Sequence, residues 1–165
     1  MGTRRDLRRA GRRHGIALAY HDNTMAKNVK IALIGHCGPD SSYLRSVCAK
    51  AAQGVQVLMA DDDSELQDVL AQGADLLLFN RELGYGFTHK AGVDAIRHLR
   101  ALSPNLRMML VSNYPEAQAE AVANGALPGF GKREIGSPRV VEVLRAALEA
   151  PATSPVNPAS AEVLP

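Results

Sequence analysis

The chain has 165 residues, 46% of them hydrophobic, which fits one globular domain with a core and excludes a disordered polypeptide. No apolar run approaches the roughly 20 residues of a membrane-spanning helix and no signal peptide is visible, so we expect a cytoplasmic protein. The net charge is only +2, and the two cysteines exclude a disulfide framework and a cysteine-rich metal site.

Charge is distributed unevenly along the chain. Residues 1–30 carry eight Lys or Arg and two Asp, a net charge of +6, which leaves −4 for the remaining 135 residues. An arginine-rich arm can bind the phosphates of nucleic acid or anionic lipid. We instead interpret residues 1–27 as a disordered leader, with Met25 as an alternative start of translation, and expect neither nucleic acid nor membrane as a partner. The proline-rich residues 151–165 are predicted to be a disordered tail.

Between these ends, residues 28–150 alternate between short apolar runs and segments with apolar residues at helical spacing. In chain order, the apolar runs predict strands at 29–34, 55–60, 75–79, 107–111 and 126–130. The segments that follow them predict helices at 40–52, 64–72, 92–102, 115–124 and 138–149. Five strand–helix units in this order predict a parallel sheet covered by helices on both faces.

Capping and breaking residues mark the limits of these elements. Asp40 or Ser41 is expected to cap the first helix. Ser64 and Gln67 have the spacing of a capping box for the second helix. Pro128 cannot donate to a sheet ladder, so the fifth strand is expected at an edge of the sheet.

Polar residues and glycines follow the carboxyl ends of the predicted strands, where ligands gather in open parallel sheets. They are Gly35, His36 and Cys37, then Asp61, Asp62 and Asp63, then Asn80, Arg81 and Glu82, then Ser112, Asn113 and Tyr114, and finally Gly131, Lys132 and Arg133. In the run LLLFNRE the apolar strand ends at Asn80, where an aspartate would suggest a phosphate acceptor. This edge of the sheet is therefore the candidate functional site.

In element order and spacing, residues 28–150 resemble the receiver domains of bacterial response regulators, the CheY-like family. The stretch SNYPEAQAEAVANGALPGFGK is similar to the family's fourth strand end, fourth helix, Gly-Ala turn and fifth strand ending in lysine. The resemblance implies an α/β fold of the flavodoxin-like type, a doubly wound five-stranded parallel sheet in the order 2-1-3-4-5. It also implies a role in two-component or phosphorelay signal transduction.

The resemblance gives a role to five strand-end positions. Asn80 matches the aspartate that receives the phosphoryl group, while Gly35 and His36 match the acidic pair that holds magnesium. Ser112 matches the switch hydroxyl, and Lys132 matches the lysine that pairs with phosphate. An amide is a poor nucleophile, and neither glycine nor histidine is a hard oxygen ligand for Mg²⁺. We therefore expect a receiver-like protein that is not phosphorylated, is not an enzyme and binds no metal or cofactor.

Two further departures from the family's pattern lie next to the lysine. Arg133 stands where the family usually has proline. The aromatic switch position falls on Gly129, and Phe130 comes one residue late.

With few acids in the pocket, the environment of Lys132 should differ from that in ordinary receivers. We expect Lys132 to face Asn80 and His36, in a fixed hydrogen-bonded state with Asn80. Glu82 or the acidic run 61–63 are the carboxylates that could reach it instead. The pocket is predicted to be neutral or slightly positive.

Three other features near the strand ends are expected to have structural and not chemical roles. Cys37 is taken as a plain loop residue rather than a reactive or metal-bound thiol. The stretch GHCGPDSS is taken as a turn that leads into a helix rather than a phosphate cradle. The run of aspartates at 61–63 is taken as a solvated turn that favours the following helix dipole.

The long loop RELGYGFTHKAG, residues 81–92, carries Tyr85, Phe87, His89 and Lys90. Aromatic and basic residues on a glycine-rich loop are typical of recognition surfaces. The loop is therefore the candidate contact with a partner, although it could also fold back over the pocket as a lid.

These patterns predict a signalling protein that acts by binding another protein, such as a kinase, a phosphotransfer protein or an output protein, or a second copy of itself in a homodimer. Two alternatives stay open. The first is a receiver phosphorylated at a non-standard residue such as Ser112. The second is a binder of a small molecule or cofactor, such as a nucleotide, flavin or cobalamin, in the strand-end crevice.

Overall fold

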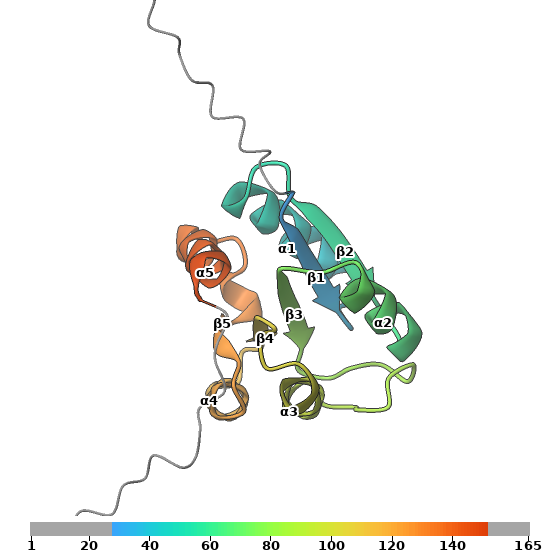
Figure 1. Cartoon of the computed structure of the whole chain (residues 1–165). Coiled ribbons are helices and arrows are strands. Elements are labelled where there is room, and N and C mark those ends of the chain that lie inside the picture. Colours follow the sequence, from blue (N-terminus) through green and yellow to red (C-terminus); the bar gives the residue numbers. More distant parts are fainter. Residues whose placement is uncertain (1–27, 152–165) are drawn as a thin grey trace, which may run out of the picture.

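The computed structural model describes residues 28–151 and shows a five-stranded parallel sheet in the order β2-β1-β3-β4-β5 (Figure 1). The strands are β1 Lys30–Ile34, β2 Gln56–Ala60, β3 Leu76–Asn80, β4 Met108–Val111 and β5 Leu127–Phe130. The helices are α1 Gly38–Ala51, α2 Asp63–Ala71, α3 Gly92–Leu102, α4 Pro115–Ala123, the short 3-10 helix η1 Lys132–Glu134 and α5 Pro138–Glu149. The predicted fold class and strand order are confirmed, and the predicted element bounds agree within two residues. The predicted leader, and the predicted tail beyond residue 151, lie outside the described residues.

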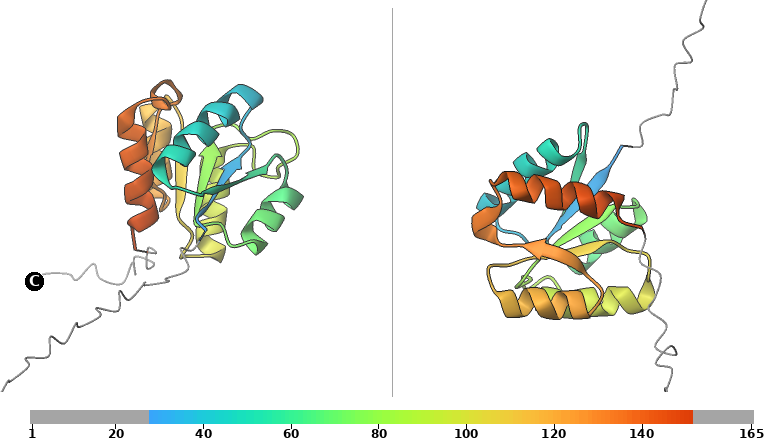
Figure 2. Two further views of the ribbon diagram at one scale, coloured as in Figure 1. Left: turned by 90° about the horizontal axis from the view of Figure 1, so that it is seen from above. Right: turned by 90° about the vertical axis from the view of Figure 1, so that its left-hand side faces the viewer.

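Two hydrophobic cores hold the helices to the sheet, one on each face. α2, α3 and α4 pack on the face that carries Ala32 and Ile34 of β1, whereas α1 and α5 pack on the face that carries Ile31 and Leu33. Figure 2 shows this arrangement, with α1 and α5 on one side of the strands and α3 and α4 on the other. In β3 the run Leu76–Phe79 is completely buried, as a central strand covered on both faces requires. Among the described residues, no helix is long and apolar enough to cross a membrane.

Helix α1 begins earlier than its predicted cap at Asp40 or Ser41. Its N-cap is Cys37, which makes no side-chain capping bond, and a proline stands in the first turn. Because the fixed φ of Pro39 suits the start of a helix, the chain becomes helical before the two polar residues that were expected to cap it. Asp40 therefore lies inside the first turn of α1, where its carboxylate is free to bind another group.

The predicted capping box of α2, Ser64 with Gln67, is also wrong. The N-cap is Asp62, whose Oδ1 accepts a hydrogen bond from the backbone N–H of Glu65 at 2.8 Å. Glu65 in turn accepts from the backbone N–H of Asp61 at 2.7 Å. The same type of capping thus occurs two residues earlier, because an aspartate there serves as well as a serine.

Strand β5 lies at the edge of the sheet, as the exposed Pro128 predicted. Its pairing with β4 shifts register, which indicates a bulge. Gly129 packs against the carbonyl oxygen of Leu110, where any Cβ would overlap it. The extra residue turns Phe130 inward to 2% exposure, so the aromatic residue that comes one position late belongs to the core.

A side chain from α4 closes the hydrogen bonding around this bulge. Gln118 Nε2 lies 3.0 Å from the carbonyl oxygen of Leu110, 3.1 Å from that of Ser112 and 3.0 Å from that of Phe130. These backbone acceptors lie on β4, directly after it, and on β5, so one side-chain amide contacts both strands at the bulge. Gln118 therefore ties α4 to the end of the sheet that carries the candidate site.

Candidate functional site

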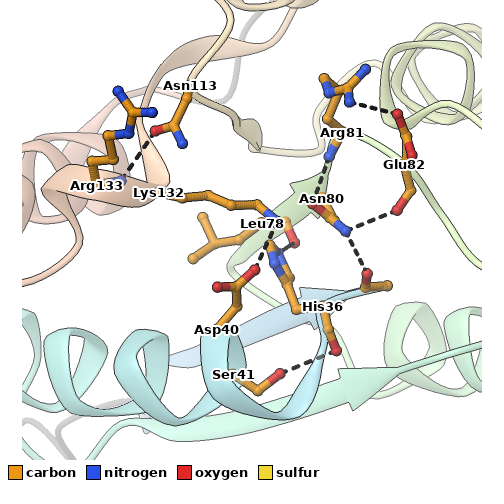
Figure 3. Close-up of polar contacts among 11 residues, drawn as sticks. His36, Asp40, Ser41, Leu78, Asn80, Arg81, Glu82, Asn113, Lys132 and Arg133 are labelled. Carbon is orange, nitrogen blue, oxygen red and sulfur yellow. Dashed lines mark hydrogen bonds and ion pairs between the residues drawn. The ribbon is translucent and has the colours of Figure 1, made fainter.

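Asn80 is the last residue of β3, and its side-chain amide holds the backbone around it (Figure 3). Its Nδ2 donates to the carbonyl oxygens of Gly35 at 2.9 Å and of Glu82 at 2.8 Å. Its Oδ1 accepts from the backbone N–H of Arg81 at 2.9 Å. The amide therefore joins the end of β1 to the loop after β3. An amide that donates two bonds and accepts one can make this set of contacts, and a carboxylate cannot, because it has no hydrogen to donate.

Gly35, at the first of the two acidic-pair positions, has no room for a side chain. Its φ is +68°, in the region that only glycine adopts without strain. A Cβ there would lie 2.7 Å from Leu83 Cδ2 and 3.5 Å from the ring of Phe87. The loop after β3 thus covers the position where the family's pattern has an acid.

His36, at the second of these positions, is buried, with 4% of its surface exposed. Its Nε2 lies 3.0 Å from the carbonyl oxygen of Leu78 on β3, and because a carbonyl only accepts, Nε2 carries the hydrogen. Nδ1 is buried and has no partner among the described residues. Burial lowers the pKa of His36 to about 4, and the charge of Lys132 acts in the same direction. His36 is therefore neutral at neutral pH.

Lys132 does not bind Asn80, contrary to the expectation from the sequence. Its Nζ donates to Asp40 Oδ2 at 2.7 Å, across from the first turn of α1 (Figure 3). Both side chains are partly buried, with 31% of Lys132 and 22% of Asp40 exposed, and this hydrogen bond lowers the pKa of the Asp40 carboxyl. The carboxylates expected to reach Lys132 bind elsewhere: Glu82 pairs with Arg81 at 2.5 Å.

Asp40, expected from the sequence only as a helix cap, is the residue that binds Lys132. The available signal was the Pro39–Asp40 pair, which lies five and six residues after Ile34, the end of β1. Proline at the start of a helix moves the next residue from the cap into the first turn, on the edge of the sheet where the other strand-end residues gather.

A crevice of about 170 Å³ brings together three of the five positions to which the resemblance gives a role, Asn80, Ser112 and Lys132. Its walls are Asn80, Arg81, Glu82, Ser112, Asn113, Tyr114 and Lys132. Ser112 is buried, and its Oγ accepts from the backbone N–H of Tyr114 at 3.2 Å. The Arg81 guanidinium lies 4.4 Å from the centre of the Tyr114 ring, at cation–π distance. Gly35 and His36 do not line this crevice.

The acidic run 61–63 is divided between capping and loop contacts. Asp62 caps α2, and Asp63 Oδ2 accepts from the backbone N–H of Thr88 at 2.8 Å and from its hydroxyl at 2.5 Å. Thr88 lowers the pKa of the Asp63 carboxyl. Within residues 28–151, no group of three His, Cys, Asp or Glu side chains is arranged to hold a metal ion.

The loop after β3 folds back against the body of the domain. The backbone N–H of Leu83 donates to the carbonyl of Lys90 at 2.8 Å, and Lys90 Nζ donates to the carbonyls of Tyr85, at 3.0 Å, and Phe87. Phe87 is 2% exposed and belongs to the core, whereas Tyr85 is completely exposed. His89 lies half-buried, with its ring 4.8 Å from that of His98. The loop thus covers the core through Phe87 and leaves Tyr85 free for a contact.

No protein-family model and no curated protein sequence matches the chain. Solved structures do resemble it. NtrX from Brucella abortus matches with a TM-score of 0.61 and 18% identity over 73% of this chain, which spans only 26% of NtrX. The receiver domain of a DNA-binding response regulator from Colwellia psychrerythraea 34H has a TM-score of 0.59 and 13% identity, over 74% of this chain and 99% of that one.

A third similar structure is a response regulator from Burkholderia pseudomallei with a phosphorylated aspartic acid, a calcium ion and citrate. It has a TM-score of 0.52 and 20% identity, over 74% of this chain and 67% of that one. Together these similarities show that the chain has the fold of a response-regulator receiver domain.

Proposed function

We propose that this chain, with its receiver-domain fold, is a signalling protein that acts by binding another protein and is not itself phosphorylated at the end of β3. The observation that supports the proposal most strongly is the hydrogen bonding of the Asn80 side chain. Its amide donates to two backbone carbonyls at 2.8 and 2.9 Å, so the residue at the phosphoacceptor position serves as a fixed link between two loops.

The surroundings of Asn80 include Ser112 and Lys132, but carry no acid at positions 35 and 36, where phosphoryl transfer needs a pair of magnesium ligands. Position 35 is covered by Leu83, and position 36 carries a buried neutral imidazole, so neither can offer an oxygen to Mg²⁺. Without a metal ion to neutralise the phosphoryl oxygens, a carboxylate nucleophile would gain little even if one were present. These features support a protein that has the receiver fold but does not carry out phosphoryl transfer.

Two alternative functions find less support. The crevice of about 170 Å³ is smaller than the roughly 300–1,000 Å³ of pockets that bury drug-sized ligands, which disfavours a nucleotide, flavin or cobalamin there. Phosphorylation of Ser112 is disfavoured because its side chain is 3% exposed and its Oγ already accepts a backbone hydrogen bond.

We propose the tip of the loop after β3 as part of the surface that binds the partner. Tyr85 is completely exposed between two glycines, and Lys90 Nζ lies 5.9 Å from the centre of its ring. An exposed aromatic side chain on a loop pinned by hydrogen bonds loses little entropy on binding, as is common at interaction hot spots. A kinase, a phosphotransfer protein, an output protein or a second copy of this chain are the partners that this fold suggests.

The first experiment tests phosphorylation. The purified full-length chain is incubated with Mg²⁺ and acetyl phosphate, and its intact mass is measured, with a receiver domain that carries the usual aspartate as positive control. We expect no added phosphoryl group. A stoichiometric acyl phosphate on this chain would contradict the proposal.

The second experiment tests binding. Proteins captured from native cells by the wild-type chain are compared with those captured by Tyr85→Ala and by Tyr43→Ala. Tyr43 is a matched control, because it is an exposed tyrosine, 66% accessible, on α1. We expect Tyr85→Ala to lose a partner that Tyr43→Ala keeps, and equal capture by all three would remove the loop from the interface.

A further inference from the structure

The crevice at the carboxyl ends of β3 and β4 offers positive charge and hydrogen-bond donors. Lys132 and Arg81 both line it, with 31% and 39% of their side chains exposed. Ser112 adds a buried hydroxyl whose oxygen accepts from a backbone N–H. Such a group of donors is complementary to a small oxyanion.

A carboxylate from another part of the chain already binds Lys132, one of the two cations that line this crevice. Asp40, 92 residues away in sequence, places Oδ2 2.7 Å from Lys132 Nζ. The ion pair is only partly accessible to solvent, so water screens it less than a surface pair. The Asp40 carboxyl also has a lowered pKa, so it stays ionised at neutral pH.

His36 shapes this arrangement without adding charge to it. It lies beside the pair, where both Asp40 and Lys132 influence its pKa, and burial keeps it neutral at neutral pH. The positive charge that faces Asp40 is therefore that of Lys132. Arg81, on the far side of the crevice, is paired with Glu82.

We propose that Asp40 is a built-in anion for Lys132, which keeps the crevice closed to small oxyanions such as inorganic phosphate and fastens the first turn of α1 to the segment after β5. The inference rests on the proposed function, because it explains how a receiver fold holds its lysine in place without a phosphoryl group.

A competing oxyanion must first displace the Asp40 carboxylate from Lys132. Its apparent affinity is therefore reduced by the fraction of molecules in which the pair is open. If the pair is open in about a tenth of the molecules or fewer, removing the carboxylate should raise the affinity for phosphate tenfold or more. Asn is the conservative replacement, since it keeps the shape of Asp40 and removes its charge.

The test is a calorimetric titration of the full-length chain with inorganic phosphate, with chloride at matched ionic strength as blank. Asp40→Asn should bind phosphate about tenfold or more tightly than wild type. The double variant Asp40→Asn/Lys132→Met should lose this gain. Asp68→Asn, which removes one exposed carboxylate on α2, is the matched control for net charge and should behave as wild type.

The proposal is overturned if Asp40→Asn binds phosphate no better than wild type, or if the gain survives Lys132→Met. Circular dichroism checks that the variants fold, and Asp40→Ser serves as a second variant with the same expected gain if Asp40→Asn does not fold. Intact mass after a separate incubation with Mg²⁺ and acetyl phosphate separates this inference from the proposed function. Covalent phosphate on the wild type after treatment with acetyl phosphate contradicts the proposed function, whereas reversible binding to Asp40→Asn tests Asp40 alone.

Discussion

Replacing Asn80 by aspartate, the residue that receiver domains usually carry at this position, should destabilise this protein. Asn80 Nδ2 donates to the carbonyl oxygens of Gly35 and Glu82, at 2.9 and 2.8 Å. After Asn80→Asp, a carboxylate oxygen would face both carbonyl oxygens with no hydrogen between them. Only the bond from the backbone N–H of Arg81, at 2.9 Å, would survive.

The magnitude follows from these contacts. Each lost hydrogen bond contributes about 0.5–1.5 kcal/mol, and leaving a partly buried acceptor without a donor adds about 1–3 kcal/mol. The structure can relax by turning the side chain toward solvent, because Asn80 is only half-buried. We therefore expect Asn80→Asp to lower the free energy of unfolding at pH 7 by about 2–4 kcal/mol.

Urea unfolding of the full-length protein measures this free energy. The matched control is Asn113→Asp, because Asn113 uses its Oδ1 to accept from the backbone N–H of Arg133 at 3.1 Å and its exposed side chain can keep that bond as a carboxylate. The control should change stability by no more than about 0.5 kcal/mol. If Asn80→Asp proved as stable as wild type, the amide would not be needed as a double donor.

Three further predictions concern the same edge of the sheet, each measured by urea unfolding. Gly35→Ala should cost about 1–3 kcal/mol more than Gly54→Ala, because both have φ near +70° but only the Cβ at Gly35 meets another side chain, Leu83. Phe87→Ala should cost about 3–5 kcal/mol and Tyr85→Ala less than about 0.5 kcal/mol, and similar costs would mean that the loop does not pack as described. Because burial holds the pKa of His36 at about 4, below the ordinary 6.5, neutral His36 contributes its full stability above pH 6.5. About 3 kcal/mol of it should be lost as the pH falls from 6.5 to 4, and a His36→Gln variant that loses as much as wild type would refute this.

The order of the elements could be predicted because each strand and helix carries its own signal. The run Leu76–Phe79, which precedes Asn80, is apolar at every position. It is completely buried in the structure, as a central strand must be. Pro128 correctly indicated an edge strand, because a missing N–H has the same consequence wherever the sheet lies in the molecule. Such signals depend on neighbours in sequence.

The contacts of the candidate site could not be predicted in the same way. Whether Lys132 meets Asn80, Glu82 or Asp40 depends on where α1 begins, and one proline moved that start by two residues. Whether the aromatic residues of the loop are buried or exposed depends in part on Gly35, because this glycine leaves space that Phe87 and Leu83 fill. These outcomes come from pairs of residues far apart in sequence, for which hydrophobic period and capping rules carry no information.

The attachment of α4 has a consequence for how this domain opens. Only Ala121 of this helix is buried, so apolar contacts hold α4 weakly, and polar contacts from Gln118 to the sheet and from Arg97 to Glu120 add to them. Local unfolding starts where burial is least, so the backbone amides of α4 should exchange with deuterium before those of α3 or α5. A protein that engages this helix would meet a segment whose displacement requires less free energy than that of α3 or α5.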